Sequence, residues 1–430
     1  MNEDSKKGKL TSKTNEKAGK GFSFWFSAFF ILGTVAGRGY LALPYAFLIT
    51  GWTGLLLLIF LFLNSLYSAV CLGKCWSILE ERYEEYRKKN RRPYASIAYR
   101  SFGKIMQYFV SFSLFVNLFG VSIIYLLLSS EIIVSMGEVI GLSYCNWITI
   151  FTVILCPLLW FGSPTDLVFV GVLSFTTTIV VCFALIVLII SEGTVPVTKY
   201  FSQTTLKNYA LGFGVMSFSL GGAASYPTFQ IDMADRNDFH KSATLAFALV
   251  LSLYLPIGIL GFCAYGEKIT TNILDSIAIS AFKRIIEILL VLHMILTVPI
   301  IINPCLQEFE ELFNIPDAFG WKRVVLRSSI MIFILFICLS IPDFGKVMTL
   351  IGGSSITLTT TVFPCLFYYR LTSQKSRSWP KKYVPYYEKF YLIIIIISGV
   401  VGGAVGTYAA VRNIVELQYF VPPCYINENK

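Results

Sequence analysis

The stretch FILGTVAGRGYLALP (Phe30–Pro44) lies in the middle of the first long apolar run of the sequence. Its three glycines, its arginine and its proline lower helix propensity at a depth where lipid offers free backbone groups no partner. A second run is interrupted by SFSLGGAASYP (Ser217–Pro227), and in both stretches the last glycine precedes the proline by five residues. We therefore expect two helices that break halfway across a membrane.

The composition identifies the class of protein. Of the 430 residues, 55% are hydrophobic, 16% are aromatic and only 14% are charged, and the mean hydropathy is +0.68. Soluble proteins carry about a quarter charged residues, so the apolar surplus must face hydrocarbon. This excludes a soluble enzyme, a disordered chain and a disulfide scaffold. The net charge of +10 needs no nucleic acid partner, because cytosolic loops of membrane proteins are basic.

Eleven apolar runs are long enough to cross the bilayer, which takes about 20 residues each. Each must be α-helical, because lipid leaves no other way to satisfy the backbone. We expect an all-α integral membrane protein with a cytosolic tail (1–22), a transmembrane domain (23–412) and a non-cytosolic tail (413–430). The predicted spans are 23–49, 52–77, 104–135, 146–162, 166–190, 209–231, 241–264, 282–305, 323–341, 345–369 and 389–412.

The distribution of basic residues predicts the orientation. Of the 35 Lys and Arg residues, 25 fall on the side of the N-terminal tail and eight on the other side. The N-terminus is therefore expected in the cytosol of a multi-pass protein of the plasma membrane or of a lysosomal or vacuolar membrane. Cys145 and Cys424 both fall on the non-cytosolic side, where a disulfide between them is possible. Cys71 and Cys75 have no second pair or His to complete a zinc set, and we expect neither a metal nor a cofactor.

The two interruptions fall in the first and sixth spans. Equivalent positions are thus five helices apart and enter the membrane from opposite sides, which indicates an inverted repeat of five plus five helices with an added eleventh. Main-chain N–H groups of Gly39–Ala42 would suit a carboxylate, and carbonyl groups of Phe218–Leu220 would suit an ammonium. The alternative is that the glycines only permit close packing, as we expect for the Gly-x-x-x-Gly pairs that begin at Gly399 and Gly402.

These residues resemble the amino acid/auxin permease family, which belongs to the amino acid–polyamine–organocation superfamily. The segments Gly37–Phe47 with Gly51-Trp52, and Met216–Gly222 with Tyr226-Pro227, are similar to its first-helix and sixth-helix motifs. The resemblance covers residues 22–412 and implies a leucine-transporter-like fold, a substrate between helices 1 and 6, and alternating access. Weaker matches complete the ordered set: Tyr265-Gly266, Asn272–Leu274, His293 with Thr297–Pro299, and Ile341–Gly345.

The breaks and the resemblance together predict the substrate site. Two positions depart from the family pattern: Gly33 replaces an Asn that is thought to lend an oxygen to sodium in coupled relatives, and Arg38 replaces a small residue. Arg38 would repel Na⁺, and it either holds the carboxylate of an anionic substrate or turns to water or a structural partner. The predicted substrate-binding residues are Thr34, Gly37, Arg38, Gly39, Tyr40, Leu41, Phe218, Ser219, Leu220, Gly221 and Gly222.

Three residues are candidates for ion coupling. His293 and Glu131 are titratable groups within spans, and the hydroxyl of Thr297 lies near His293. Each has a structural alternative, since His293 can be a packing residue, Glu131 can reach the outer interface and Thr297 can bond its own backbone.

A secondary active transporter of amino acids, with proton-coupled symport, explains these features together. The alternatives are a sodium-coupled symporter or exchanger and, from another class, an amino-acid sensor. The expected partners are an amino acid, H⁺ or Na⁺ and the lipid bilayer, without nucleic acid; the oligomeric state stays open. We do not expect an enzyme, because the two histidines of the chain do not form an acid–base constellation.

Overall fold

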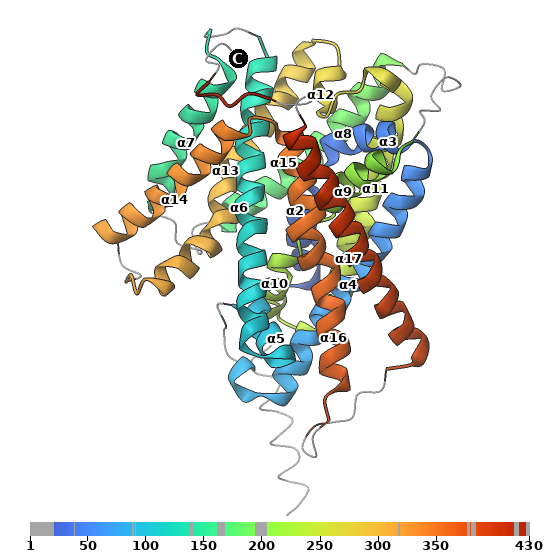
Figure 1. Cartoon of the computed structure of the whole chain (residues 1–430), viewed down its shortest axis with the longest axis vertical. Helices are drawn as coiled ribbons and strands as arrows, with labels where there is room; N and C mark the ends of the chain where they lie inside the picture. Colours follow the sequence, from blue (N-terminus) through green and yellow to red (C-terminus); the bar gives the residue numbers. More distant parts are fainter. Residues whose placement is uncertain are drawn as a thin grey trace, which may run out of the picture.

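The computed structural model describes residues 21–37, 39–87, 90, 92–137, 141–160, 168–193, 204–316, 319–375, 379, 384–416 and 421–426, without the side chains of 168–172 and 174–175. Each of the eleven predicted spans overlaps a helix or a broken helix, residues 161–162 and 166–167 of the fourth and fifth predicted spans lie outside the described residues, and the described part contains no β-strand. The helices form one bundle (Figure 1). The predicted all-α class is confirmed.

Eight spans are continuous helices. The unbroken spans are α4 (Thr53–Arg82), α6 (Lys104–Ser135), α7 (Tyr144–Trp160), α8 (Val168–Glu192), α11 (Phe239–Tyr265), α13 (Ala281–Leu312), α14 (Trp321–Ser340) and α17 (Tyr386–Val415). Two short helices in the connections are α5 (Pro93–Phe102) and α12 (Ile273–Ser276).

The first and sixth spans are both broken, as the glycines and prolines predict. The first consists of α2 (Phe24–Ala36), η1 (Tyr40–Ala42) and α3 (Leu43–Thr50), with a bend of 47° between its halves. The sixth consists of α9 (Leu206–Ser219), η4 (Ala223–Ser225) and α10 (Tyr226–Ile231). Pro44 and Pro227 lie in the first turn of their second halves, where a missing N–H leaves no helical bond unmade. The matched prolines therefore restart each helix.

The tenth span differs from the uninterrupted helix that its apolar pattern predicts. It begins as α15 (Phe344–Ile351), continues through two π-helical segments, η7 (Gly352–Ile356) and η8 (Leu358–Val362), and ends as α16 (Phe363–Ser373). The wider turns are stabilised by hydroxyl groups, since Thr357 donates to the carbonyl of Gly352 at 2.7 Å. A Cβ built on Gly352 would lie 2.0 Å from the carbonyl oxygen of Gly214, so the segment packs directly on α9.

The glycines of α17 allow the close packing expected for the eleventh span. A Cβ built on Gly399 would lie 2.7 Å from Val362, and one on Gly402 would lie 2.6 Å from the ring of Phe213. Both Gly-x-x-x-Gly pairs are therefore occupied within the chain, against α9 and the tenth span.

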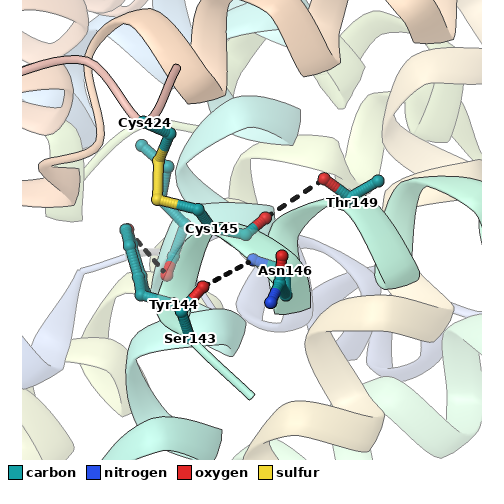
Figure 2. Close-up of a disulfide and its surroundings, with 7 residues drawn as sticks. Ser143, Tyr144, Cys145, Asn146, Thr149 and Cys424 are labelled. Atoms are coloured by element: carbon teal, nitrogen blue, oxygen red, sulfur yellow. Dashed lines mark hydrogen bonds between the residues drawn. A yellow bond between two sulfur atoms is a disulfide. The ribbon is translucent and has the colours of Figure 1, made fainter. Parts of the chain in front are cut away.

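A disulfide joins Cys145, at the start of α7, to Cys424, beyond α17 (Figure 2). Their Cα atoms are 5.8 Å apart, and 279 positions separate them in sequence. The main-chain N–H of Cys424 also donates to the carbonyl of Leu339 at 2.8 Å. The bond that the sequence leaves undecided is formed, and it ties the last segment of the chain to α7 and α14.

At the opposite end of the bundle, the start of the first span lies beside the end of the sixth. The N–H of Phe22 donates to the carbonyl of Asp232 at 2.8 Å, and the N–H of Ala234 donates to the carbonyl of Phe22 at 3.0 Å. Close by, Arg236 forms an ion pair with Glu80 at the end of α4. These contacts join α2, α4 and α10 at this end.

Candidate functional site

The two broken spans touch at their breaks. The hydroxyl of Ser219, the last residue of α9, donates to the carbonyl of Gly39 at 3.0 Å. A Cβ built on Gly39 would lie 2.4 Å from Ser219 Oγ and 3.0 Å from Ser219 Cα. Gly39 is therefore needed for the close approach of the two backbones, and the structure brings these two predicted site residues together.

Tyrosine hydroxyls meet the carbonyl groups that the breaks expose. Tyr254 Oη, from α11, lies 2.9 Å from the carbonyl oxygen of Val35 and 3.0 Å from that of Ser219. Tyr125, from α6, donates to the carbonyl of Gly37 at 2.8 Å. The last four carbonyls of a helix have no partner inside it, so these two hydroxyls stabilise the ends of both first halves. They also occupy carbonyl oxygens that would otherwise attract a cation.

A small hollow lies beside the first break, with a volume of about 10 Å³, which is room for about one water. One wall is formed by residues of the break, namely Gly37, Gly39, Tyr40, Leu41 and Ala42. Its other walls are side chains of α6, α13 and α15, and all six are apolar. They are Ile124, Leu128, Leu290, Met294, Phe344 and Met348.

The predicted substrate-binding residues divide into two groups. Gly37, Gly39, Tyr40 and Leu41 line the hollow, whereas Thr34 and the residues of the sixth-span break do not. The hydroxyl of Thr34 donates to the carbonyl of its own helix at Ile31, at 2.9 Å.

In the sixth span, Phe218 and Leu220 are buried, and Gly221 packs on Ile356. The carbonyl of Phe218 accepts from the N–H of Gly221 at 3.1 Å. Gly222 packs on Val35 of α2, so the break of the sixth span contacts the first span without lining the hollow. Arg38 lies outside the described residues.

The three ion-coupling candidates lie at different depths. His293 is buried on α13, and its Nε2 lies 3.3 Å from a Cβ built on Gly37, so it faces the first break. Thr297 donates to the carbonyl of His293 at 2.6 Å, a bond within its own helix. Glu131 lies one turn beyond Leu128 on α6 and is not among the residues that line the hollow.

Sequence reasoning missed the two tyrosines and the apolar lining. A tyrosine inside an apolar run carries a hydroxyl that needs a partner when buried, and this signal singles out Tyr125 and Tyr254. The lining residues give no such signal, because an apolar side chain that faces a substrate looks the same as one that faces lipid.

Comparisons with known proteins agree with this fold. A family profile described as "Transmembrane amino acid transporter protein" matches residues 20–411. Amino acid transporter AVT1D of Arabidopsis thaliana is 24% identical, over 90% of this chain and 70% of the relative. Amino acid transporter AVT1J of the same plant is 21% identical, over 91% of both chains.

Two solved structures are similar in fold alone. The transporter MhsT in complex with L-phenylalanine superposes with a TM-score of 0.55 and 12% identity, covering 89% of this chain and 98% of that one. A manganese transporter of Eremococcus coleocola superposes with a TM-score of 0.60 and 10% identity, covering 95% and 88%. The predicted leucine-transporter-like fold is confirmed. The chain belongs to the transmembrane amino acid transporter family, the amino acid/auxin permeases, and is a transporter by family rather than an enzyme.

Proposed function

We propose that the protein is a secondary active transporter of neutral amino acids with apolar side chains, which it carries by alternating access. The observation that carries this proposal is the hollow beside the first break, where one wall is the broken segment and the other walls are apolar side chains. An α-amino acid of this kind likewise has a polar part, its ammonium and carboxylate groups, and an apolar side chain.

The carboxylate of the substrate binds at the start of the second half of the first span. Main-chain N–H groups of Tyr40 and Leu41 lie there, at the positive end of the helix dipole of η1 and α3. The substrate side chain extends between Leu128 of α6 and Met294 of α13. An acidic or basic side chain would be buried there without a partner, so these walls disfavour it.

The hollow is too small for an amino acid in this conformation, so binding requires the walls to separate. Met294 and Met348 have flexible, unbranched side chains that adapt to different shapes. The structure thus corresponds to a closed state of the transport cycle.

We infer that protons rather than sodium ions drive transport. His293 lies at the break and Glu131 lies just outside the hollow, so titratable groups are present at two depths of the path. The hydroxyl of Tyr254 lies within hydrogen-bond distance of the carbonyl oxygens of Val35 and Ser219, so these oxygens are less available to coordinate a cation. Gly33 also offers no side-chain oxygen to sodium.

The orientation with a cytosolic N-terminus is supported by the disulfide. Disulfides persist on the oxidising side of a membrane, and the Cys145–Cys424 bond joins α7 to the C-terminal segment, which lies at the end of the bundle opposite α5 (Figure 1). The same orientation places the excess of basic residues in the cytosol.

Uptake into proteoliposomes tests the function. Leucine and phenylalanine should be accumulated when an inward proton gradient is imposed, and glutamate and lysine should not. A sodium gradient without a proton gradient should give no accumulation. Accumulation under sodium alone would favour a sodium symporter, and exchange without net uptake would favour an exchanger. Binding without any transport would favour an amino-acid sensor.

A further inference from the structure

A polar cavity of about 290 Å³ lies where the start of α5, the first turn of α6 and the last turn of α13 meet. None of the described residues that line it also lines the hollow. In Figure 1, α5 lies at the end of the bundle opposite α12, which is the cytosolic end in the proposed orientation. The described residues of the lining are all polar or charged. They are Asn90, Arg92, Ser96, Gln107 and Glu311.

Arg92 is held in place at the start of α5 by a ring of hydrogen bonds. Its main-chain N–H donates to Asn90 Oδ1 at 2.8 Å, and Asn90 Nδ2 donates to Ser96 Oγ at 3.0 Å. Ser96 Oγ in turn donates to the carbonyl of Arg92 at 3.0 Å, which closes the ring. These bonds fix the backbone from which the guanidinium extends, so its charge is preorganised in one wall of the cavity.

The guanidinium of Arg92 reaches α13 and still has donors to spare. Its Nη2 donates to Glu311 Oε2 at 2.5 Å, and its Nη1 lies 3.6 Å from Glu308 Oε1. A guanidinium has five N–H groups, and a single one of them makes a hydrogen bond among the described residues. The Arg92 side chain is 35% exposed and that of Glu311 is 60% exposed. The pair is therefore accessible to a solute and contributes little to stability.

The lining thus offers unused groups of both kinds. The donors are the remaining N–H groups of Arg92 and the amide of Gln107, which makes no side-chain hydrogen bond among the described residues. The acceptor is Oε1 of Glu311, which accepts no hydrogen bond from the described residues. A carboxylate placed against Arg92 and Gln107, together with an ammonium placed on Glu311, would use all of them.

This combination selects a small zwitterion. An anion without an ammonium group would be repelled by Glu311 and Glu308, and a cation without a carboxylate would be repelled by Arg92. The volume lies just below the range of about 300–1,000 Å³ for sites of drug-sized ligands, so it suits a smaller molecule. Since the described lining holds no apolar residue, we expect a small polar side chain on the ligand, as in serine.

We propose that this cavity is a second amino-acid site, which binds a free α-amino acid with a small polar side chain from the cytosolic side. The ligand carboxylate accepts from Arg92 and Gln107, and its ammonium donates to Glu311. The bound ligand ties α5 and α6 to the end of α13.

The tie has a consequence for transport, because α13 also carries Leu290 and Met294 in the wall of the hollow. Occupancy of the cavity restrains this helix, which has to separate from the other walls before a substrate fits. Transport therefore slows when the ligand accumulates in the cytosol. This consequence rests on the proposed function, whereas the binding site itself does not.

Three variants test the assigned contacts. R92Q removes the guanidinium that holds the carboxylate, Q107A removes its second donor, and E311Q replaces the acceptor of the ammonium with a neutral amide. The matched control is E85Q, which removes the ion pair between Glu85 and Arg100 of the same helix α5 without changing a lining residue. None of the four side chains is buried, so all four variants should fold, and their Tm values verify this.

Binding of radiolabelled L-serine to the purified full-length protein is measured by equilibrium dialysis. R92Q and E311Q should each raise the Kd at least about tenfold, because each removes a hydrogen bond to a charged group. Q107A should raise the Kd by a smaller factor, and E85Q should leave it unchanged. Acetate alone and methylammonium alone, each in large excess, should not displace serine, because neither has both charges.

Hydrogen exchange locates the bound ligand. Serine should slow amide exchange at the start of α5 and in the last turn of α13 in the parent and in E85Q, but not in R92Q. The proposal is overturned if serine does not bind, if R92Q and E311Q bind it as tightly as the parent, or if acetate or methylammonium alone displaces it.

Uptake of leucine into proteoliposomes, with serine on the cytosolic side, reports separately on the proposed function. Serine should slow uptake by the parent and by E85Q, but not by R92Q. If none of these proteins takes up leucine, the proposed function fails, while the binding and exchange results still decide on the second site.

Discussion

Replacing Gly39 by alanine should weaken substrate binding by forcing the two breaks apart. The added Cβ would lie 2.4 Å from Ser219 Oγ, closer than real Cβ contacts come, and 3.0 Å from Ser219 Cα, which is tighter than most such contacts. The φ angle of Gly39 is −162°, an extended value open to alanine, so the effect arises from the overlap alone. Overpacking costs about 1–3 kcal/mol, and 1.4 kcal/mol is a factor of ten, so Kd should rise about 5- to 150-fold.

The assay is equilibrium binding of radiolabelled leucine to purified protein, with uptake measured in parallel. S219A is the control, because it removes the hydrogen bond to the carbonyl of Gly39 without adding bulk, at a cost of about 0.5–1.5 kcal/mol. The double variant G39A/S219A should lose less binding free energy than the sum of the two single variants, because the close contact between the added Cβ and Ser219 Oγ no longer exists. Wild-type affinity in G39A, or strict additivity in the double variant, would refute the contact between the breaks.

Three further changes test other parts of the site and fold. M294A should enlarge the hollow and shift the ratio of phenylalanine to leucine uptake by about tenfold towards phenylalanine, as measured by competition. Y254F should leave the carbonyls of Val35 and Ser219 without their donor, costing about 1–3 kcal/mol and lowering both the Tm and the uptake rate. C424S should lower the Tm, because it removes the disulfide that joins residues 279 positions apart. The expected loss in the free energy of unfolding is about 2–5 kcal/mol.

Each of these predictions has its own comparison. For Y254F the matched variant is Y391F, which loses a bond between α17 and Asn64 Oδ1 of α4, neither of which is a broken helix, and should leave uptake unchanged. For C424S, treatment of the wild type with a reducing agent should lower its Tm to that of the variant, and the variant itself should not respond. An unchanged uptake ratio in M294A would show that this wall does not contact the substrate side chain.

The architecture could be predicted because membranes constrain it strongly. Apolar runs of the required length leave the helix as the only backbone solution, and Pro44 and Pro227 mark where the broken helices restart. The π-helical part of the tenth span could not be predicted in this way. It depends on the contact between Gly352 and the backbone of α9, and nothing in the local sequence reports that contact.

The site was predictable only where it consists of backbone. The glycines predict the first break, and Gly39 contacts the sixth span there through the hydrogen bond from Ser219. The side chains around it come from α6, α13 and α15, and their positions depend on how distant helices pack. Glu131 is recognisable in the sequence as an acid inside an apolar run, but its place beside the hollow and not in its wall depends on how α6 packs.

The paired main-chain bonds of Phe22 with Asp232 and Ala234 have a consequence for the transport cycle. They join the start of the first span to the end of the sixth through main-chain hydrogen bonds, which no side-chain substitution removes. For the hollow to open towards that end, either both half-spans tilt as one rigid unit or the two main-chain hydrogen bonds break first. Breaking them costs about 1 kcal/mol per bond. Tilting of the two half-spans as one unit would keep both bonds, and the remaining helices would then be the frame against which this unit moves.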